Sequence, residues 1–263
     1  MPSFEELLAI LDQPRGDRQN DVGLLSPDLT IADAYRLQFA VKAARVAAGD
    51  RIVGRKAAFT SLSVRKQFPE FPAPLVGTIL ASHLREDGAT IDLNADSGIT
   101  FVENEIGALM KRDLEGPGVT PLQALAAIEG FFPAIEIAPM NGGMLEGRRT
   151  NQHIIAKEKA DGGYVIFGPT LLTPGQIDVR LEGSVMSING EARGSGAGVE
   201  AMGSPVNVVA AIANRLAEYG EKLRAGEVVI TGSLSGPARA VKGDRDALAE
   251  FTRLGRVTVR FEA

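Results

Sequence analysis

The chain of 263 residues contains no cysteine and no tryptophan, and it has only two histidines, His83 and His153. Without cysteine the protein cannot form disulfides, use a thiolate nucleophile or bind a metal through sulfur, and this composition fits a cytoplasmic protein. A serine–histidine–aspartate triad would have to use one of the two histidines. We expect both to lie on the surface rather than to act as ligands.

Long apolar runs and blocks of basic residues are also missing. No stretch of about twenty apolar residues is present, so we expect no membrane-spanning helix. The first residues, 1–6, lack the basic start and apolar core of a signal peptide, so we expect no secretory leader. The formal net charge is −5, and no cluster of lysine and arginine favours a nucleic-acid partner.

Three carboxylates stand among apolar residues in two segments that are typical of strands. Glu103 and Glu105 lie in Phe-Val-Glu-Asn-Glu-Ile, and Glu136 lies in Pro-Ala-Ile-Glu-Ile. Side chains alternate along a strand, so the first two point the same way, about 7 Å apart. Anions this close in apolar surroundings need a cation or a proton, and three oxygen ligands suit Mg²⁺ or Mn²⁺. A solvated strand face, or pairing of Glu136 with an arginine, is the alternative.

The pattern of segments predicts an α+β fold with a small helical N-terminal portion over 1–50 and a β-rich domain over 51–263. Thr30 and Asp33 form a helix start signal, and apolar residues then recur at helical spacing. Prolines at 121 and 205 indicate two further helix starts. Strand patterns dominate the remainder, at 51–60, 100–110, 132–137, 164–167, 178–182, 184–188, 228–231 and 255–261.

The glycine-rich run 193–198 suggests a dinucleotide-binding turn, but its context is wrong for one. The Asn189-Gly190 pair indicates a hairpin directly before the run, and the next helix starts only at Ser204. We therefore expect no dinucleotide site there.

Segments over nearly the whole chain carry a resemblance to a known family. The matching segments are 32–38, 54–61, 102–106, 111–119, 132–137, 194–198, 202–207, 223–233 and 254–261. The chain resembles the 2-oxo-4-pentenoate hydratases and 4-oxalocrotonate decarboxylases of the fumarylacetoacetate hydrolase superfamily. The resemblance implies a mixed β-roll body of the fumarylacetoacetate hydrolase C-terminal type, homo-oligomers, and association with a neighbouring pathway enzyme.

The resemblance also implies roles for individual residues. It implies that Glu103, Glu105 and Glu136 hold a divalent metal, Mg²⁺ or Mn²⁺, and that Lys56 is catalytic. A lysine there could shuttle protons or stay charged and bind a carboxylate, or it could be a surface residue. The candidate substrate-binding residues are Ser61, Lys157, Lys159 and Ser233. A turn serine and two solvated loop lysines are the plainer interpretations of the last three.

Three polar segments of the family differ in this chain. Residues 75–78 read Leu-Val-Gly-Thr where hydratases have Asp-Phe-Gly-Thr, so an acid/base carboxylate is missing. Residues 139–141 read Pro-Met-Asn where the family has Asp-Ser-Arg. Residues 156–160 read Ala-Lys-Glu-Lys-Ala where it has Ala-Asp-Asn-Ala-Ser. The proton donor is therefore left open by the sequence.

The resemblance implies a divalent-metal-dependent lyase that acts on a small 2-oxo or 2-hydroxydienoic acid. Our first hypothesis is a hydratase that adds water to a 2-hydroxypentadienoate-like substrate. The loss of the aspartate at position 75 favours the alternative, a decarboxylase of a 4-oxalocrotonate-like diacid. A C–C hydrolase or tautomerase, and a degenerate family member that binds without catalysis, remain further alternatives.

Overall fold

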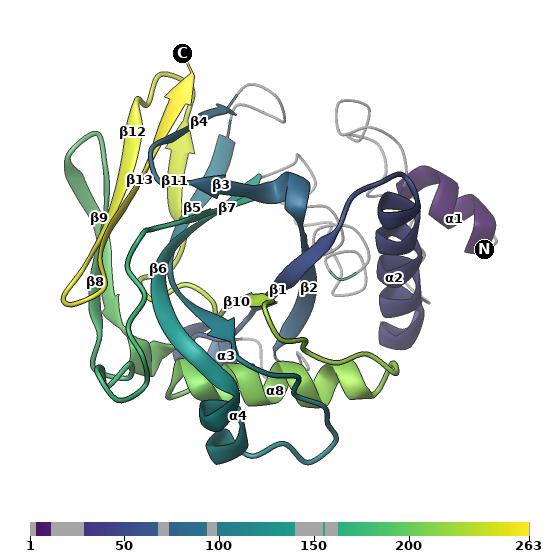
Figure 1. Ribbon diagram of the computed structural model, residues 1–263. Helices are drawn as coiled ribbons and strands as arrows, with labels where there is room; N and C mark the ends of the chain where they lie inside the picture. The colour runs from purple at the N-terminus through teal and green to yellow at the C-terminus, as the bar shows by residue number, and fades with distance from the viewer. Residues whose placement is uncertain are drawn as a thin grey trace.

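The computed structural model describes residues 4–11, 29–67, 74–93, 99–139, 155 and 163–262. Two β-sheets form the body, and helices cover its outside (Figure 1). The helices are α1 (Phe4–Leu11), α2 (Ile31–Ala47), α3 (Leu62–Gln67), α4 (Pro121–Ala127) and α8 (Pro205–Ala217), with short 3₁₀ turns at Ala81–His83 and Gly198–Glu200. Among these helices, none is both long enough and apolar enough to cross a bilayer.

The eight-stranded sheet, here called the rolled sheet, curls on itself (Figure 1). Its strand order is β2-β1-β10-β5-β6-β7-β3, and β11 pairs with the start of β5. Its members are β1 (Ile52–Ala58), β2 (Leu75–Leu80), β3 (Leu84–Glu86), β5 (Ile99–Met110), β6 (Ile128–Pro139), β7 (Tyr164–Phe167), β10 (Val228–Ile230) and β11 (Ala238–Val241). Gly54 allows β1 to approach β10, because a Cβ there would lie 2.1 Å from the carbonyl oxygen of Val228.

The second sheet has the order β4-β13-β12-β8-β9 and packs against the outer face of β6. Its members are β4 (Ala89–Asp92), β8 (Gly183–Ile188), β9 (Glu191–Ala197), β12 (Asp246–Phe251) and β13 (Gly255–Glu262). Alternate residues of β12 are buried, which places Ala247, Ala249 and Phe251 in the main core. One apolar core thus joins the two sheets.

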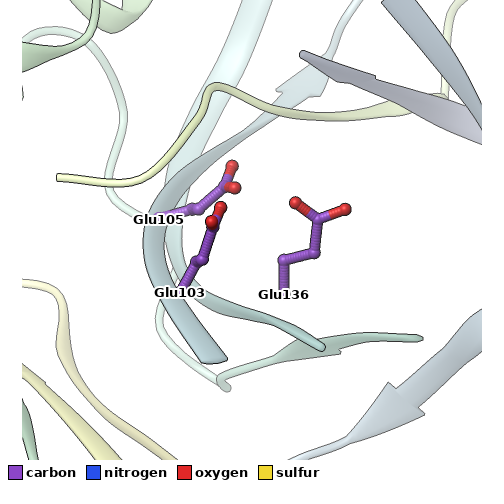
Figure 2. A group of neighbouring side chains, drawn as sticks. All are labelled: Glu103, Glu105 and Glu136. Carbon is purple, nitrogen blue, oxygen red and sulfur yellow. The ribbon is translucent and has the colours of Figure 1, made fainter. Parts of the chain in front are cut away.

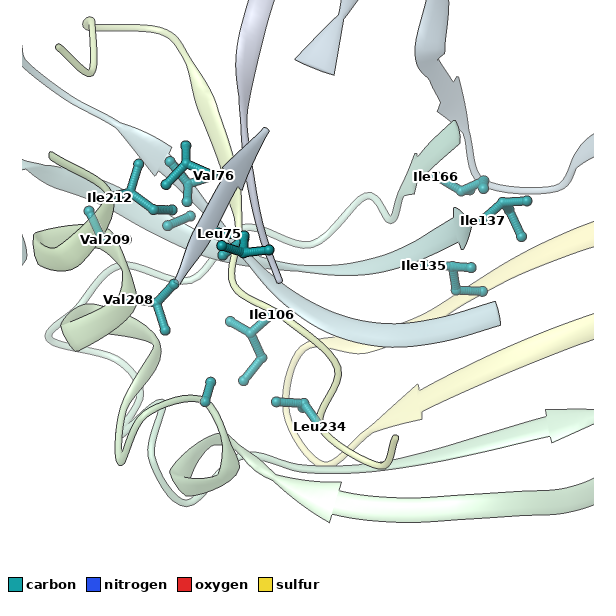
Figure 3. Packing of buried hydrophobic residues seen from close by; sticks show 14 of the residues in the cluster. Leu75, Val76, Ile106, Ile135, Ile137, Ile166, Val208, Val209, Ile212 and Leu234 are labelled. Atoms are coloured by element: carbon teal, nitrogen blue, oxygen red, sulfur yellow. The ribbon is translucent and has the colours of Figure 1, made fainter. Parts of the chain in front are cut away.

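Helix α8 packs against strands β1 and β2 of the rolled sheet. The Ser204 hydroxyl accepts from the backbone N–H of Val206 and caps the helix, and Pro205 occupies its first turn. Figure 3 shows Val208 and Ile212 of α8 in the same cluster as Val76 of β2. Helix α2 begins at Ile31, directly after the predicted start signal, and Thr30 caps it in a capping box with Asp33.

The predicted α+β class is confirmed, and the division into domains at residue 50 stays a prediction. Residues 193–197 of the glycine run lie in strand β9, and Gly198 opens the 3₁₀ turn that follows it. The predicted strand over 178–182 is wrong. Asp178 accepts two hydrogen bonds from the Arg180 guanidinium, and its carbonyl accepts from the N–H of Leu181, so the segment is a turn.

Candidate metal centre

The three predicted carboxylates converge on the inner face of the rolled sheet. In the antiparallel pair β5–β6, Glu103 lies directly opposite Glu136, and Glu105 lies opposite Ala134. One carboxylate oxygen of each glutamate lies within 4.8 Å of those of the other two. Figure 2 shows the three side chains pointing into one common space. Glu105 and Glu136 are buried and Glu103 is half-buried.

Lys56 reaches the same space from strand β1. Its Nζ lies 3.1 Å from Oε1 of Glu136, and both side chains are buried. Strands β1 and β6 are separated by β10 and β5 in the sheet. In a flat sheet three strand spacings would amount to about 14 Å, so the curl of the sheet brings this lysine to the carboxylates.

A backbone amide fixes the position of Glu105. The N–H of Gly232 donates to Oε2 of Glu105 over 2.6 Å. Gly232 has a φ of +97°, and a Cβ on it would lie 1.8 Å from the hydroxyl oxygen of Thr60. Only glycine fits both the backbone angle and the close approach of Thr60. The segment after β10 therefore contributes to the site through its backbone.

Asn104 supports the acidic strand from the opposite face of β5 and is fully buried. Its amide nitrogen donates to Oγ of Ser184 over 2.7 Å, and its amide oxygen accepts from Oγ of Ser235 over 2.5 Å. The backbone carbonyl of Asn104 accepts from the N–H of Leu234. These bonds tie the strand between its two glutamates to the second sheet and to the segment that carries Gly232.

The residues present fit a hard divalent cation. If all three carboxylates are ionised, the ammonium of Lys56 balances only one of them, and concentrated buried negative charge is costly. Three carboxylate oxygens are a donor set that Mg²⁺ and Ca²⁺ accept. Glu103, Glu105 and Glu136 are the residues that would hold such an ion.

The predicted substrate-binding residues differ in their placement. Ser233 directly follows Gly232, and its Oγ is buried without a hydrogen-bond partner in the described part of the chain. The backbone of Ser61 forms an isolated antiparallel β-bridge with the backbone of Ala201, ahead of α8. Lys157 and Lys159 lie outside the described residues.

Leu75 and His83 are two further residues that the sequence singled out, whereas His153 lies outside the described residues. Leu75 is fully buried and pairs with Ala58 two residues beyond Lys56, so it faces the same side of the sheet as this lysine. The aspartate expected there by resemblance is thus replaced by an apolar group beside the site.

His83 is buried and lies edge-on to Tyr164, with ring centroids 6.5 Å apart, so its expected surface position is wrong.

The fold and this constellation have counterparts among known proteins. Residues 46–262 match the fumarylacetoacetate (FAA) hydrolase C-terminal family. The chain belongs to this family. Among its relatives is a 2-hydroxyhexa-2,4-dienoate hydratase of Comamonas testosteroni, 35% identical over 83% of this chain and 82% of the relative. A 4-oxalocrotonate decarboxylase of Pseudomonas sp. (strain CF600) is 30% identical over 89% of this chain and 87% of the relative.

A solved structure of this family matches over the full length. The 4-oxalocrotonate decarboxylase from Pseudomonas putida G7, complexed with calcium and acetate, has a TM-score of 0.85 and 28% identity. The match covers 100% of this chain and 99% of that chain. The same decarboxylase is also known in complex with magnesium and adipate. Both ions are hard cations of the kind that the three carboxylates fit.

Proposed function

We propose that this protein is a divalent-metal-dependent lyase that adds water to a 2-hydroxydienoic acid, with Glu103, Glu105 and Glu136 as ligands of Mg²⁺ or Mn²⁺. The convergence of the three carboxylates within 4.8 Å carries this proposal. The naming of relatives that are 35% and 32% identical as dienoate and pentenoate hydratases supports it. We also propose a small 2-oxo acid as substrate and a homo-oligomeric state.

The roles of the residues follow from their placement. A divalent ion in the site would act as a Lewis acid toward the carboxylate and the 2-oxygen of the substrate. Lys56 lies against Glu136 and is the candidate for moving a proton to or from a carbon of the dienol. Ser233 has a hydroxyl available to donate a hydrogen bond to the substrate. Ser61, whose backbone forms a β-bridge with Ala201 ahead of α8, is the other candidate for a hydrogen bond to the substrate.

Decarboxylation of a vinylogous 2-oxo diacid is the second candidate. The apolar Leu75 beside Lys56 removes one candidate acid/base group for activating water. The full-length match to a decarboxylase structure supports the same alternative. In that case Lys157 and Lys159 would bind the second carboxylate of the substrate.

Turnover assays with Mg²⁺ test the proposal. Purified protein is incubated with 2-hydroxypenta-2,4-dienoate, with 2-hydroxyhexa-2,4-dienoate and with 4-oxalocrotonate. Loss of the dienol absorbance without CO₂ release supports hydration, and CO₂ release supports decarboxylation. If the protein binds magnesium but turns over none of the three candidate substrates, it is a metal-binding protein and the proposed lyase activity is wrong.

A further inference from the structure

The glycine-rich run of strand β9 leaves one face of that strand without side chains. Gly194 and Gly196 are two residues apart in the strand, so they share a face. They pair in register with Met186 and Ser184 of β8, both of which are buried. The bare face therefore points into the molecule, although β9 is the last strand of the second sheet (Figure 1).

The backbone of Leu234 fills the space beside Gly196. A Cβ on Gly196 would lie 1.8 Å from the carbonyl oxygen of Leu234 and 2.6 Å from its carbonyl carbon. A Cβ on Gly194 would lie 3.1 Å from the Cβ of Ser235, the next residue. The φ of Gly196 lies outside the left-handed region, so only the approach of Leu234 excludes a side chain at this position.

The segment that contains Leu234 is also bound to strand β5. The N–H of Leu234 donates to the backbone carbonyl of Asn104, and Oγ of Ser235 donates to the amide oxygen of Asn104. The amide nitrogen of Asn104 donates to Oγ of Ser184, which pairs with Gly196. The segment is thus held by β5 and contacts β9, and a side chain at position 196 would force it to move against these bonds.

The same segment supplies two groups to the acidic site. The N–H of Gly232 donates to Glu105, and Oγ of Ser233 is buried without a hydrogen-bond partner among the described residues. Buried hydroxyls are normally hydrogen-bonded, so this one is suited to donate to a bound substrate. The planar peptide holds consecutive Cα atoms about 3.8 Å apart, so a displacement of Leu234 carries Ser233 with it.

We propose that Gly196 is a positioning residue of the site, which acts through Leu234 to place the Ser233 hydroxyl against the head group of a metal-bound 2-oxo acid. The inference rests on the proposed function, because it assumes that the substrate accepts a hydrogen bond from Ser233. Strand β9 then contributes to substrate binding without touching the substrate. A side chain at position 196 would push Leu234 away from β9 and move the hydroxyl off its partner.

Calorimetry with oxalate, a mimic of the 2-oxo acid head group, tests this role without turnover. Wild type, Gly196→Ala, Ser233→Ala and the double variant are each titrated at a fixed, saturating concentration of free Mg²⁺. We expect each single variant to bind oxalate about tenfold more weakly, the effect of losing one hydrogen bond to a charged group. Because both substitutions act on the same hydroxyl, the double variant should bind oxalate as weakly as Ser233→Ala alone.

Gly190→Ala is the matched control in the turn between β8 and β9. Gly190 has a φ of +79°, and a Cβ there meets nothing within 4 Å. This variant should lose stability through backbone strain and keep the oxalate affinity of the wild type. Gly194→Ala serves if Gly196→Ala does not fold, as judged by thermal unfolding. It should weaken oxalate binding less, because its contact with Ser235 is longer.

An oxalate affinity that is unchanged in the β9 glycine variant overturns the inference. An equal further loss when the glycine substitution is added to Ser233→Ala also overturns it, because the effect would then not pass through the hydroxyl. If oxalate does not bind to the magnesium-loaded wild type, the proposed function itself fails.

Discussion

The Nζ of Lys56 lies 3.1 Å from Oε1 of Glu136, although two strands separate β1 from β6 in the sheet. The pair is buried inside the roll, so neither charge is well solvated. Removal of one partner of a buried pair leaves an uncompensated charge, which typically costs about 3–5 kcal/mol. Lys56 can therefore affect both the free energy of unfolding and the turnover rate, and separate measurements distinguish the two effects.

Lys56→Met should lower the free energy of unfolding of the metal-free protein by about 3–5 kcal/mol, because Glu136 loses its buried cation. Magnesium supplies positive charge in its place, so added Mg²⁺ should raise the melting temperature more in the variant than in the wild type. If the lysine moves the proton, turnover should fall by at least about 100-fold. Thermal unfolding with and without Mg²⁺, and steady-state kinetics, measure the two effects.

Lys111→Met is the matched control for this variant. Lys111 pairs with Glu129 at 3.4 Å on the surface, where both side chains are substantially exposed. Exposed pairs contribute at most about 1 kcal/mol, so we expect little change in stability and none in turnover. A Lys56→Met protein that loses its affinity for Mg²⁺ would contradict the assignment, because loss of a cation should not weaken cation binding.

Glu136→Gln should weaken magnesium binding by at least about tenfold, because it replaces an anionic ligand by a neutral amide. Glu103→Gln and Glu105→Gln should act in the same direction. Glu129→Gln provides the comparison on the same strand, since Glu129 pairs with Lys111 on the surface. Titration calorimetry with MgCl₂ measures all four variants. Equal affinities in Glu136→Gln and Glu129→Gln would remove Glu136 from the metal site.

The sequence predicted the acidic part of the site because strand alternation is a local rule. Glu103 and Glu105 had to share a face once their segment was recognised as a strand. The position of Glu136 opposite Glu103 depends on the β5–β6 register, which local patterns do not fix. The contact between Lys56 and Glu136 depends further on the curl of the sheet.

The features that the sequence did not predict depend on contacts between distant parts of the chain, or run against the local secondary-structure propensity. Gly232 and Asn104 support the site through partners more than 75 residues away in the chain, so no local pattern reveals them. Strand β12 was overlooked because Ala-Leu-Ala-Glu favours a helix, yet pairing with β8 and β13 makes it a strand. Tertiary pairing overrides propensity there.

Gly232→Ala should weaken magnesium binding through Glu105. A Cβ at this position would lie 1.8 Å from the Thr60 hydroxyl oxygen, so the backbone must shift and the 2.6 Å bond to Glu105 must lengthen. We expect a loss of roughly 10- to 100-fold in affinity, the range typical of partners that orient a metal ligand. Calorimetry with MgCl₂ measures it.

Gly236→Ala separates this effect from backbone strain. Gly236 has a φ of +80°, similar to the +97° of Gly232, but a Cβ there meets nothing within 4 Å. Both variants should therefore lose stability through the strained backbone. Only Gly232→Ala should lose magnesium affinity, and equal losses in the two variants would contradict the role of the Gly232 amide.

A second group of charges, in which Lys42 and Arg55 are buried and Glu221 is half-buried, joins helix α2 to the rolled sheet on the side away from the glutamates. Glu221 accepts from Nζ of Lys42 over 2.7 Å and from the guanidinium of Arg55 over 2.9 Å. Arg55 also donates to Oγ1 of Thr78. Burial alone would raise the pKa of Glu221, but the hydrogen bond and charge of Lys42, with the charge of Arg55, outweigh it and lower this pKa.

Glu221→Gln should therefore destabilise the protein in a way that depends on pH. The lowered pKa of Glu221 means that its contribution is fully present above the unfolded-state pKa of about 4.3 and is lost as the pH falls through the folded-state value. At pH 7 we expect a loss of about 2–4 kcal/mol, because Lys42 and Arg55 lose their shared anion. Urea unfolding of both proteins from pH 7 to pH 3.5 measures the difference, which should shrink below about pH 4.3.

Glu218→Gln is the matched control, because it shows how much the loss of an exposed carboxylate changes the pH dependence of stability. Glu218 pairs with Arg215 at 2.8 Å, but its side chain is more than half exposed. Its substitution should change stability by at most about 1 kcal/mol at any of these pH values. A difference between wild type and Glu221→Gln that stays constant down to pH 3.5 would show that the ionised form of Glu221 does not contribute, and that the loss comes from altered packing at the junction of α2 with β1.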